Sequence, residues 1–277
     1  KGEKIMKLFK VLLAFALSAT LAGCNASTGS SQSSVTSEKT TETADSTVTI
    51  TDHADRTVTV PTNPKRVAIL GILPLPSMLT VYLDSCDSIV AMEPSSMKAA
   101  QTGVLASLYP NIVNIDTDIM DGDDVNIESL VALNPDVVFY NAADTKDLEK
   151  LENAGLTAVA FSATKWKFDC IETYNQWMKL LNQIYPDHSE EREAVVQKYA
   201  TDRYAEITDR VKDIEDRQKV LFLFQYDENA MITSSASFFG QWWCDAVGAV
   251  NVAKDVPAEK TNAKITMEQV YEWNPDV

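Results

Sequence analysis

The side chains that most often carry out catalysis or bind metals are scarce in this chain. Only two histidines occur, His53 and His188, which removes most routes to a multi-histidine metal site or a histidine-based catalytic relay. Four cysteines, at positions 24, 86, 170 and 244, are spaced too widely for a zinc knuckle or a CxxC redox pair. The chain also lacks the G-x-S-x-G elbow, the Walker A loop and the H-E-x-x-H motif. We therefore expect no catalytic residues, no metal ligands and no cofactor.

Composition and charge narrow the class of protein further. The chain has 277 residues, of which 45% are hydrophobic and 23% are charged, as in an average globular protein with a sizeable core. Lys and Arg number 24 against 40 Asp and Glu, a net charge of -16. A charge of this sign repels nucleic-acid phosphates and anionic membranes at long range. Binding of DNA or RNA is excluded as a main activity.

The first 24 residues predict export from the cytoplasm. Four lysines precede an uncharged run from Val11 to Gly23, which is too short to remain in a bilayer as a spanning helix and is typical of a signal peptide. The run ends in Leu21-Ala22-Gly23-Cys24, which resembles the lipobox of bacterial lipoproteins. We expect Cys24 to be lipidated, and the chain to be anchored by lipid alone to the outer face of the bacterial cytoplasmic membrane.

A flexible tether follows the cysteine. Twelve of the 22 residues from 25 to 46 are Ser or Thr, so this stretch buries too little apolar surface to fold. The expected organisation is a signal peptide at 1–23, the lipidated cysteine and tether at 24–46, an N-terminal lobe at 47–168, a helical connector at 169–217 and a C-terminal lobe at 218–277.

Hydrophobic patterning predicts an α/β fold with mostly parallel sheets. Alternating valines and isoleucines from 48 to 60 predict a hairpin. Short apolar runs at 66–70, 88–92, 112–115, 137–140 and 158–161 predict strands, and the segments 77–83, 127–133 and 145–153 predict helices between them. Ligands of such sheets bind in the loops after the carboxyl ends of the strands.

A long polar helix is predicted to connect two lobes. Asp187 and Glu190 form a capping box, and Tyr204, Ile207, Val211 and Ile214 make one apolar stripe on a charged rod that extends to about Asp216. Strands at 220–225 and 231–232 follow, and then a helix from 238 to 247 that ends at Gly248.

An internal repeat is the most informative pattern. Residues 125–137 align without gaps with residues 265–277, and Glu, Asn, Pro, Asp and Val are identical. The repeat predicts two lobes of related design. Because a strand, a helix and another strand follow the first copy, we expect the second lobe to be truncated at the C-terminus.

Four features together resemble one known family. They are the lipobox, the run "DHADRTVTVPTNPKRV" from Asp52 to Val67, the two Glu…Asn-Pro-Asp-Val copies and the connecting helix. From the tether onward, the chain resembles the substrate-binding lipoproteins of ABC importers for iron-siderophores, haem and cobalamin. The resemblance implies two α/β lobes joined by one helix, a small molecule held in the cleft between them, and a monomer that delivers it to a permease dimer with its ATPase.

The resemblance also implies roles for particular residues. Glu128 and Glu268, one in each repeat, resemble the pair that docks into arginine pockets of the permease, although a carboxylate in a first helical turn can also serve only as a cap. Trp166, flanked by two lysines, is the first choice for a ligand-contacting side chain, with loop packing as the alternative. The candidates for the cleft are Pro76, Met97, Tyr140, Lys165, Trp166, Tyr226, Phe238 and Trp242.

The arginines indicate what kind of chelate is bound. All six lie in the first strands or in the connector, outside the candidate loops, where only Lys98, Lys165 and Lys167 offer positive charge. A highly anionic catecholate complex favours guanidinium partners. A ferric siderophore of the hydroxamate type is therefore the first expectation, and a corrinoid, haem or a metal complex of small acids remains open.

Three other functions remain as alternatives. A free zinc or manganese receptor needs more histidines than this chain has. A surface enzyme lacks a recognisable motif, and an adhesin built on the same lobes does not require paired glutamates. Cys86, Cys170 and Cys244 are expected to be small buried residues, with a disulfide between two of them still open.

Overall fold

The structure is a computed structural model that describes residues 46–188, 194–195, 197–227, 231–236, 238–257 and 262–277. The expected signal peptide, Cys24 and the tether lie outside these residues. The described residues all belong to one compact unit. Within the described residues, no helix is both long and apolar enough to cross a bilayer.

A four-stranded parallel sheet is the centre of the first half of the chain. Its order is β4 (Ile89–Met92), β3 (Val67–Ile69), β7 (Val137–Asn141) and β8 (Ala158–Phe161), and every neighbouring pair is parallel. An antiparallel hairpin of β1 (Thr47–Thr51) and β2 (Thr57–Pro61) precedes the sheet. The predicted parallel α/β architecture and the hairpin are therefore confirmed.

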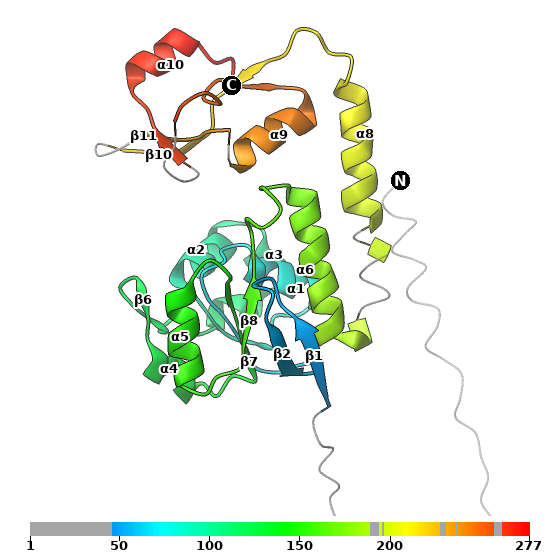
Figure 1. The fold of residues 1–277 in the computed structure, drawn as a ribbon, viewed down its shortest axis with the longest axis vertical. Helices are drawn as coiled ribbons and strands as arrows, with labels where there is room; N and C mark the ends of the chain where they lie inside the picture. Colours follow the sequence, from blue (N-terminus) through cyan, green and yellow to red (C-terminus); the bar gives the residue numbers. More distant parts are fainter. Residues whose placement is uncertain (1–45, 189–193, 196, 228–230, 237, 258–261) are drawn as a thin grey trace, which may run out of the picture. The chain divides into compact units, whose positions relative to one another are not determined.

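Helices connect these strands (Figure 1). The described elements of this part are α1 (Leu75–Leu83), α2 (Pro94–Thr102), α3 (Leu105–Leu108), the 3-10 turn η2 (Pro110–Asn114), the two-residue strands β5 (Met120–Asp121) and β6 (Asp124–Val125), α4 (Ile127–Ala132), α5 (Thr145–Asn153) and α6 (Cys170–Ile184). The strand expected at 112–115 is wrong, because Pro110 favours a helical start and the chain forms η2 there.

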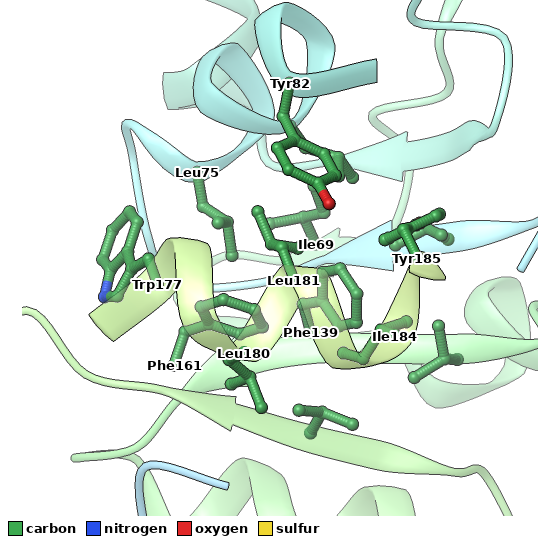
Figure 2. Packing of buried hydrophobic residues seen from close by; sticks show 14 of the residues in the cluster. Ile69, Leu75, Tyr82, Phe139, Phe161, Trp177, Leu180, Leu181, Ile184 and Tyr185 are labelled. Atoms are coloured by element: carbon green, nitrogen blue, oxygen red, sulfur yellow. The ribbon is translucent and has the colours of Figure 1, made fainter. Parts of the chain in front are cut away.

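Both faces of the sheet are buried, as a parallel sheet requires. Odd-numbered strand residues such as Ile69, Phe139 and Phe161 face α1 and α6, where Leu181 is fully buried. Figure 2 shows the side chains of α6 lying against these strand residues. Even-numbered residues of β3, β7 and β8, together with Ala91 of β4, form a second cluster with Leu130 of α4 and Leu151 of α5. Side chains that could contact a ligand or a partner are therefore expected at the two ends of the strands.

The connector is less regular than the sequence pattern predicts. Asp187 lies in a 3-10 turn, η3 (Pro186–His188), where its Oδ2 accepts a hydrogen bond from Asn63 Nδ2. Glu190 lies outside the described residues. A π-helical turn, η4 (Gln197–Thr201), leads into α8 (Asp202–Val211), which ends five residues before the predicted end. The three acids that follow, Asp213, Glu215 and Asp216, are unfavourable near a helix C-terminus, because the helix dipole is negative there.

The rest of the chain repeats the opening of the first sheet. The parallel pair of β9 (Lys219–Val220) and β12 (Val250–Asn251) corresponds to β3 and β4, and Leu221 N–H donates to Val277 O at 2.9 Å where β7 would lie. The remaining elements are β10 (Leu223–Tyr226), β11 (Met231–Ser234), α9 (Phe239–Val247), β13 (Asn262–Lys264) and α10 (Met267–Trp273). As predicted, α9 ends at Gly248, whose φ is 70°.

Truncation of the α6 core contact should destabilise the fold strongly. Leu181 is fully buried against the sheet, so Leu181→Ala leaves a cavity, and we expect the free energy of unfolding to fall by about 2–5 kcal/mol in urea titrations. The matched control is Leu108→Ala on α3, where the side chain is 63% exposed and a change of no more than about 0.5 kcal/mol is expected. Equal losses in the two variants would contradict this account of the core.

Candidate functional site

The loops at the carboxyl ends of β3, β4 and β7 are joined by hydrogen bonds. Glu93, which follows β4, accepts a hydrogen bond from Gly71 N–H through Oε1 at 2.6 Å. Asn141 Nδ2, at the end of β7, donates to Gly71 O at 3.0 Å, and Asn141 Oδ1 accepts from Ala143 N–H. We call this edge of the sheet, with the loops 71–74, 93–96, 141–144 and 162–169, the strand-end site.

Gly71 is required at the centre of this network for two reasons. Its φ is +68°, a conformation that side chains disfavour, and a Cβ would lie 3.0 Å from Asn141 Cβ. The three loops thus approach one another closely and rigidly. Sequence reasoning named the loops but missed the network, although a carboxylate and an amide directly after two buried strands are a signal that could have found it.

The acidic groups of the strand-end site are already engaged. Glu93 bonds Gly71, Asp144 caps α5 by accepting from Asp147 N–H at 2.9 Å, and Asp169 caps α6 by accepting from Glu172 N–H at 2.9 Å. Lys167, in the last of these loops, and Lys98, in α2 after the loop 93–96, are exposed, and neither forms an ion pair within the part of the chain that the structure describes. These two ammonium groups are therefore available to an anionic solute.

Three of the candidate cleft residues lie in the core instead. Pro76 is buried in α1, Met97 is buried in the cluster under α2, and Tyr140 is a strand residue with 1% exposure. The Tyr140 hydroxyl accepts a hydrogen bond from Arg56 Nη1 at 2.8 Å, and burial raises its pKa. The expectation that these side chains face a ligand is corrected: Pro76 and Met97 lie on the buried sides of α1 and α2, and Tyr140 is a strand residue packed in the core.

The two candidates after β8 are held by the hairpin turn. Lys165 Nζ pairs with Asp55 Oδ1 at 2.6 Å and donates to His53 O. The half-buried Trp166 ring packs edge-on against the His53 ring, with centroids 4.9 Å apart. Trp166 is therefore partly a packing residue, which was the alternative given for it.

Phe168, which sequence reasoning did not single out, belongs to an aromatic cluster. Lys167 and Phe168 both have positive φ, at 53° and 63°, and only the structure reveals this because such residues rarely adopt it. The Phe168 ring contacts the rings of Phe238 and Phe239 at 5.1 and 5.0 Å. Phe238 also contacts Phe224.

The remaining candidates differ in exposure. Trp242 stacks on Tyr204 of α8 with centroids 5.1 Å apart, so it packs against the predicted stripe. Tyr226, in β10, is 69% exposed and available for contact. Trp243 Nε1 donates to Cys170 Sγ at 3.1 Å, and Cys86, Cys170 and Cys244 are free thiols whose pKa values burial raises.

Glu128 and Glu268 occupy equivalent exposed positions in the first turns of α4 and α10. The N-cap of α4 is Asn126, which accepts from Ser129 N–H, and Thr266 with Gln269 forms a capping box on α10. A hydrogen bond from its own backbone N–H, with a second from Thr266, lowers the pKa of Glu268. Because other residues cap both helices, neither carboxylate is needed as the N-cap.

Comparison with known proteins supplies a context for this geometry. The sequence model described as a periplasmic binding protein matches residues 87–277. The chain is 29% identical over 246 residues to the molybdate-binding protein MolA of Haemophilus influenzae, a match that covers 82% of this chain and 67% of that protein. It is 23% identical over 236 residues to an uncharacterised ABC transporter substrate-binding lipoprotein, YvrC, of Bacillus subtilis, covering 83% and 67%.

Solved structures agree on the fold. A periplasmic solute binding protein from Veillonella parvula superposes with a TM-score of 0.69 at 25% identity, covering 84% of this chain and 67% of that one. The heme binding protein HmuT superposes with a TM-score of 0.63 at 19% identity, covering 83% and 67%. At that identity, the second likeness concerns the fold alone.

The environment of His53 should make stability depend on pH. Burial, helped by the nearby charge of Lys165, lowers its pKa from 6.5 to about 4, and a hydrogen bond with the backbone of Gln176 and the charges of Asp52 and Asp55 oppose this only in part. The unfolded chain takes up a proton near pH 6.5 while the folded chain does not, so this part of the stability is present above pH 6.5 and is lost as pH falls towards 4. His53→Asn keeps an acceptor for Ser162 N–H but does not titrate.

We therefore expect the gap in unfolding free energy between the native chain and His53→Asn to narrow by roughly 1–3 kcal/mol from pH 7.5 to pH 4.5, in urea titrations at each pH. A gap that stays constant over this range would contradict the assignment.

Proposed function

Because the chain belongs to the periplasmic binding protein family, whose members bind solutes and are not enzymes, we propose that it is the extracytoplasmic receptor of an ABC importer for a metal-containing solute. Its partners are a permease dimer with its ATPase, and it acts as a monomer. The single observation that carries the proposal is the strand-end site, where hydrogen bonds engage the polar groups of Glu93 and Asn141 and leave Lys167, in a loop of the site, and Lys98, in α2 after the loop 93–96, exposed.

The ligand that this site favours is a ferric siderophore of the hydroxamate type. Exposed apolar surface at Leu73 and Pro74 suits the organic part of a chelate, and Lys98 and Lys167 suit a small negative charge. Arg56 and Arg66 are bonded elsewhere, to Tyr140 and to the carbonyl groups of Leu133 and Asn134. A site without guanidinium groups is poorly matched to a highly charged catecholate complex.

Molybdate is the second candidate, because the relative that is 29% identical is named a molybdate-binding protein. A tetrahedral dianion is bound by backbone and side-chain donors, and the same two lysines would supply charge. Haem is less well matched, since an iron-binding imidazole is missing from the described strand-end loops and His53 Nδ1 is occupied by Ser162 N–H.

Two regions outside the ligand site complete the proposal. Cys24 would carry the lipid that holds the protein at the outer face of the cytoplasmic membrane, which the name of the B. subtilis relative supports. Glu128 and Glu268 would contact arginines of the permease. Three residues after each glutamate, Val131 and Tyr271 are 45% and 77% exposed, so each of these helices presents a carboxylate and an apolar side chain together.

Titration of tryptophan fluorescence should identify the ligand. The panel is a ferric hydroxamate, a ferric catecholate, haem, cobalamin, molybdate and free Zn²⁺ or Mn²⁺, with the ferric hydroxamate expected to saturate at low micromolar concentration or below. Lys167→Ala should weaken that binding about tenfold or more, because one charge-assisted hydrogen bond is lost. The control is Lys179→Ala, at an exposed lysine of α6 away from the strand-end loops.

Saturation by molybdate in place of the chelate would select the second candidate. Binding of no metal-containing solute by the folded protein, or a binding constant unchanged in Lys98→Ala and Lys167→Ala, would contradict the proposed site.

Removal of the two docking carboxylates should impair interaction with the permease without changing ligand binding. We expect Glu128→Ala and Glu268→Ala each to raise the concentration needed for half-maximal stimulation of importer ATPase about tenfold, with unchanged ligand affinity, because each variant loses one ion pair with the permease. Glu149→Ala is the matched control, since Glu149 is an exposed helical glutamate of α5. Stimulation at native concentrations in both docking variants would rule out this role.

A further inference from the structure

The two repeat copies end in the same way. Helix α4 is followed by Asn134 with φ 46°, and α10 by Asn274 with φ 45°, and Pro and Asp come next in both. Each helix is short, with six and seven residues. Helices of this length are marginal by themselves, so their direction depends on what holds their ends.

An aspartate joins each helix to the start of a strand. Asp136 Oδ2 accepts from the backbone N–H groups of Lys65 and Arg66 at 2.8 and 2.9 Å, just before β3. Asp276 Oδ2 accepts from Lys219 N–H at 2.8 Å, at the first residue of β9. The backbone N–H groups of the same aspartates donate to Arg66 O at 2.7 Å and Lys219 O at 2.8 Å.

A basic side chain at the start of each strand also donates a hydrogen bond back to the end of the helix. Arg66 Nε donates to Leu133 O at 3.2 Å and to Asn134 O at 3.0 Å, at the C-terminal end of α4. Lys219 Nζ donates to Trp273 O at 2.9 Å, the last residue of α10. A cation at this end of a helix satisfies unpaired carbonyl groups and opposes the negative end of the dipole.

The structure therefore holds two copies of one device, which we call the helix clamp: Asp136 with Arg66, and Asp276 with Lys219. We propose that these four are positioning residues that fix the direction of α4 and α10 on their strands, and so aim Glu128 and Glu268 at the permease. The inference rests on the proposed docking role of the two glutamates. It extends that role to residues that do not touch the partner.

Exchange between the copies provides the test, because one clamp uses arginine and the other lysine. Arg66→Met and Lys219→Met keep the aliphatic stem and remove the charge, whereas Arg66→Lys and Lys219→Arg keep a donor. The measurements are stimulation of ATPase by each variant, with the importer of the source organism in nanodiscs, and fluorescence titration with ferric hydroxamate and sodium molybdate.

The methionine variants should need about tenfold higher concentration for half-maximal stimulation, while ligand dissociation constants stay within about twofold of the native value. Arg66→Lys and Lys219→Arg should dock within about twofold of the native chain. A merely structural role would move ligand affinity and melting temperature together with docking, and that result would overturn the inference. Native docking by both methionine variants would also overturn it.

The glutamate variants separate the two proposals. If Glu128→Ala and Glu268→Ala weaken docking while the methionine variants do not, the clamp inference is wrong and the docking role of the glutamates is supported. If none of the four variants weakens docking, the docking role itself fails, and the clamp inference fails with it.

Discussion

Burial of the parallel sheet on both faces is the constraint on which the rest of this structure depends. Strands β4, β3, β7 and β8 supply alternating side chains to two separate cores, one under α6 and one under α4 and α5. A sheet covered in this way leaves only the ends of its strands to solvent. The carboxyl ends of β3, β4 and β7 carry the strand-end site, and the amino end of β3 carries one helix clamp, so the proposed ligand site and one proposed docking helix lie at opposite ends of these strands.

Several acidic side chains of the described residues act as acceptors for backbone N–H groups. Asp52 illustrates the principle: it is 2% exposed, and its two oxygens accept from Ala54, Arg56 and Ala160 N–H groups. Asp136, Asp144 and Asp169 do the same at strand starts and helix caps. Such bonds hold loops in place and engage the carboxylates, so a strongly acidic chain can still present exposed lysines at the proposed ligand site.

Much of the first sheet could be predicted, because each strand is a short apolar run between turn residues. The β7 and β8 runs, the α5 helix and the Gly248 stop agree with the structure to within about a residue. The strand predicted at 112–115 was wrong because Pro110 favours a helical turn there. Tyr140 was predicted to lie in a loop after its strand, but β7 continues to Asn141 and keeps Tyr140 in the core. The left-handed Lys167 and Phe168 carry no local signal at all.

The repeat was visible in the sequence, but the hydrogen bonds that its residues make were not. Alignment finds Asn-Pro-Asp-Val twice, yet the partners of the two aspartates lie 70 and 57 positions earlier in the chain, at Arg66 and Lys219. The conformation of Asn134 and Asn274 turns the chain so that each Asp reaches back to a strand, and Pro fixes the backbone between them. A motif that looks like a helix terminator thus connects a helix to a strand. One copy uses Arg and the other Lys, which indicates that the connection requires a donor to the helix carbonyl groups and does not depend on one particular side chain.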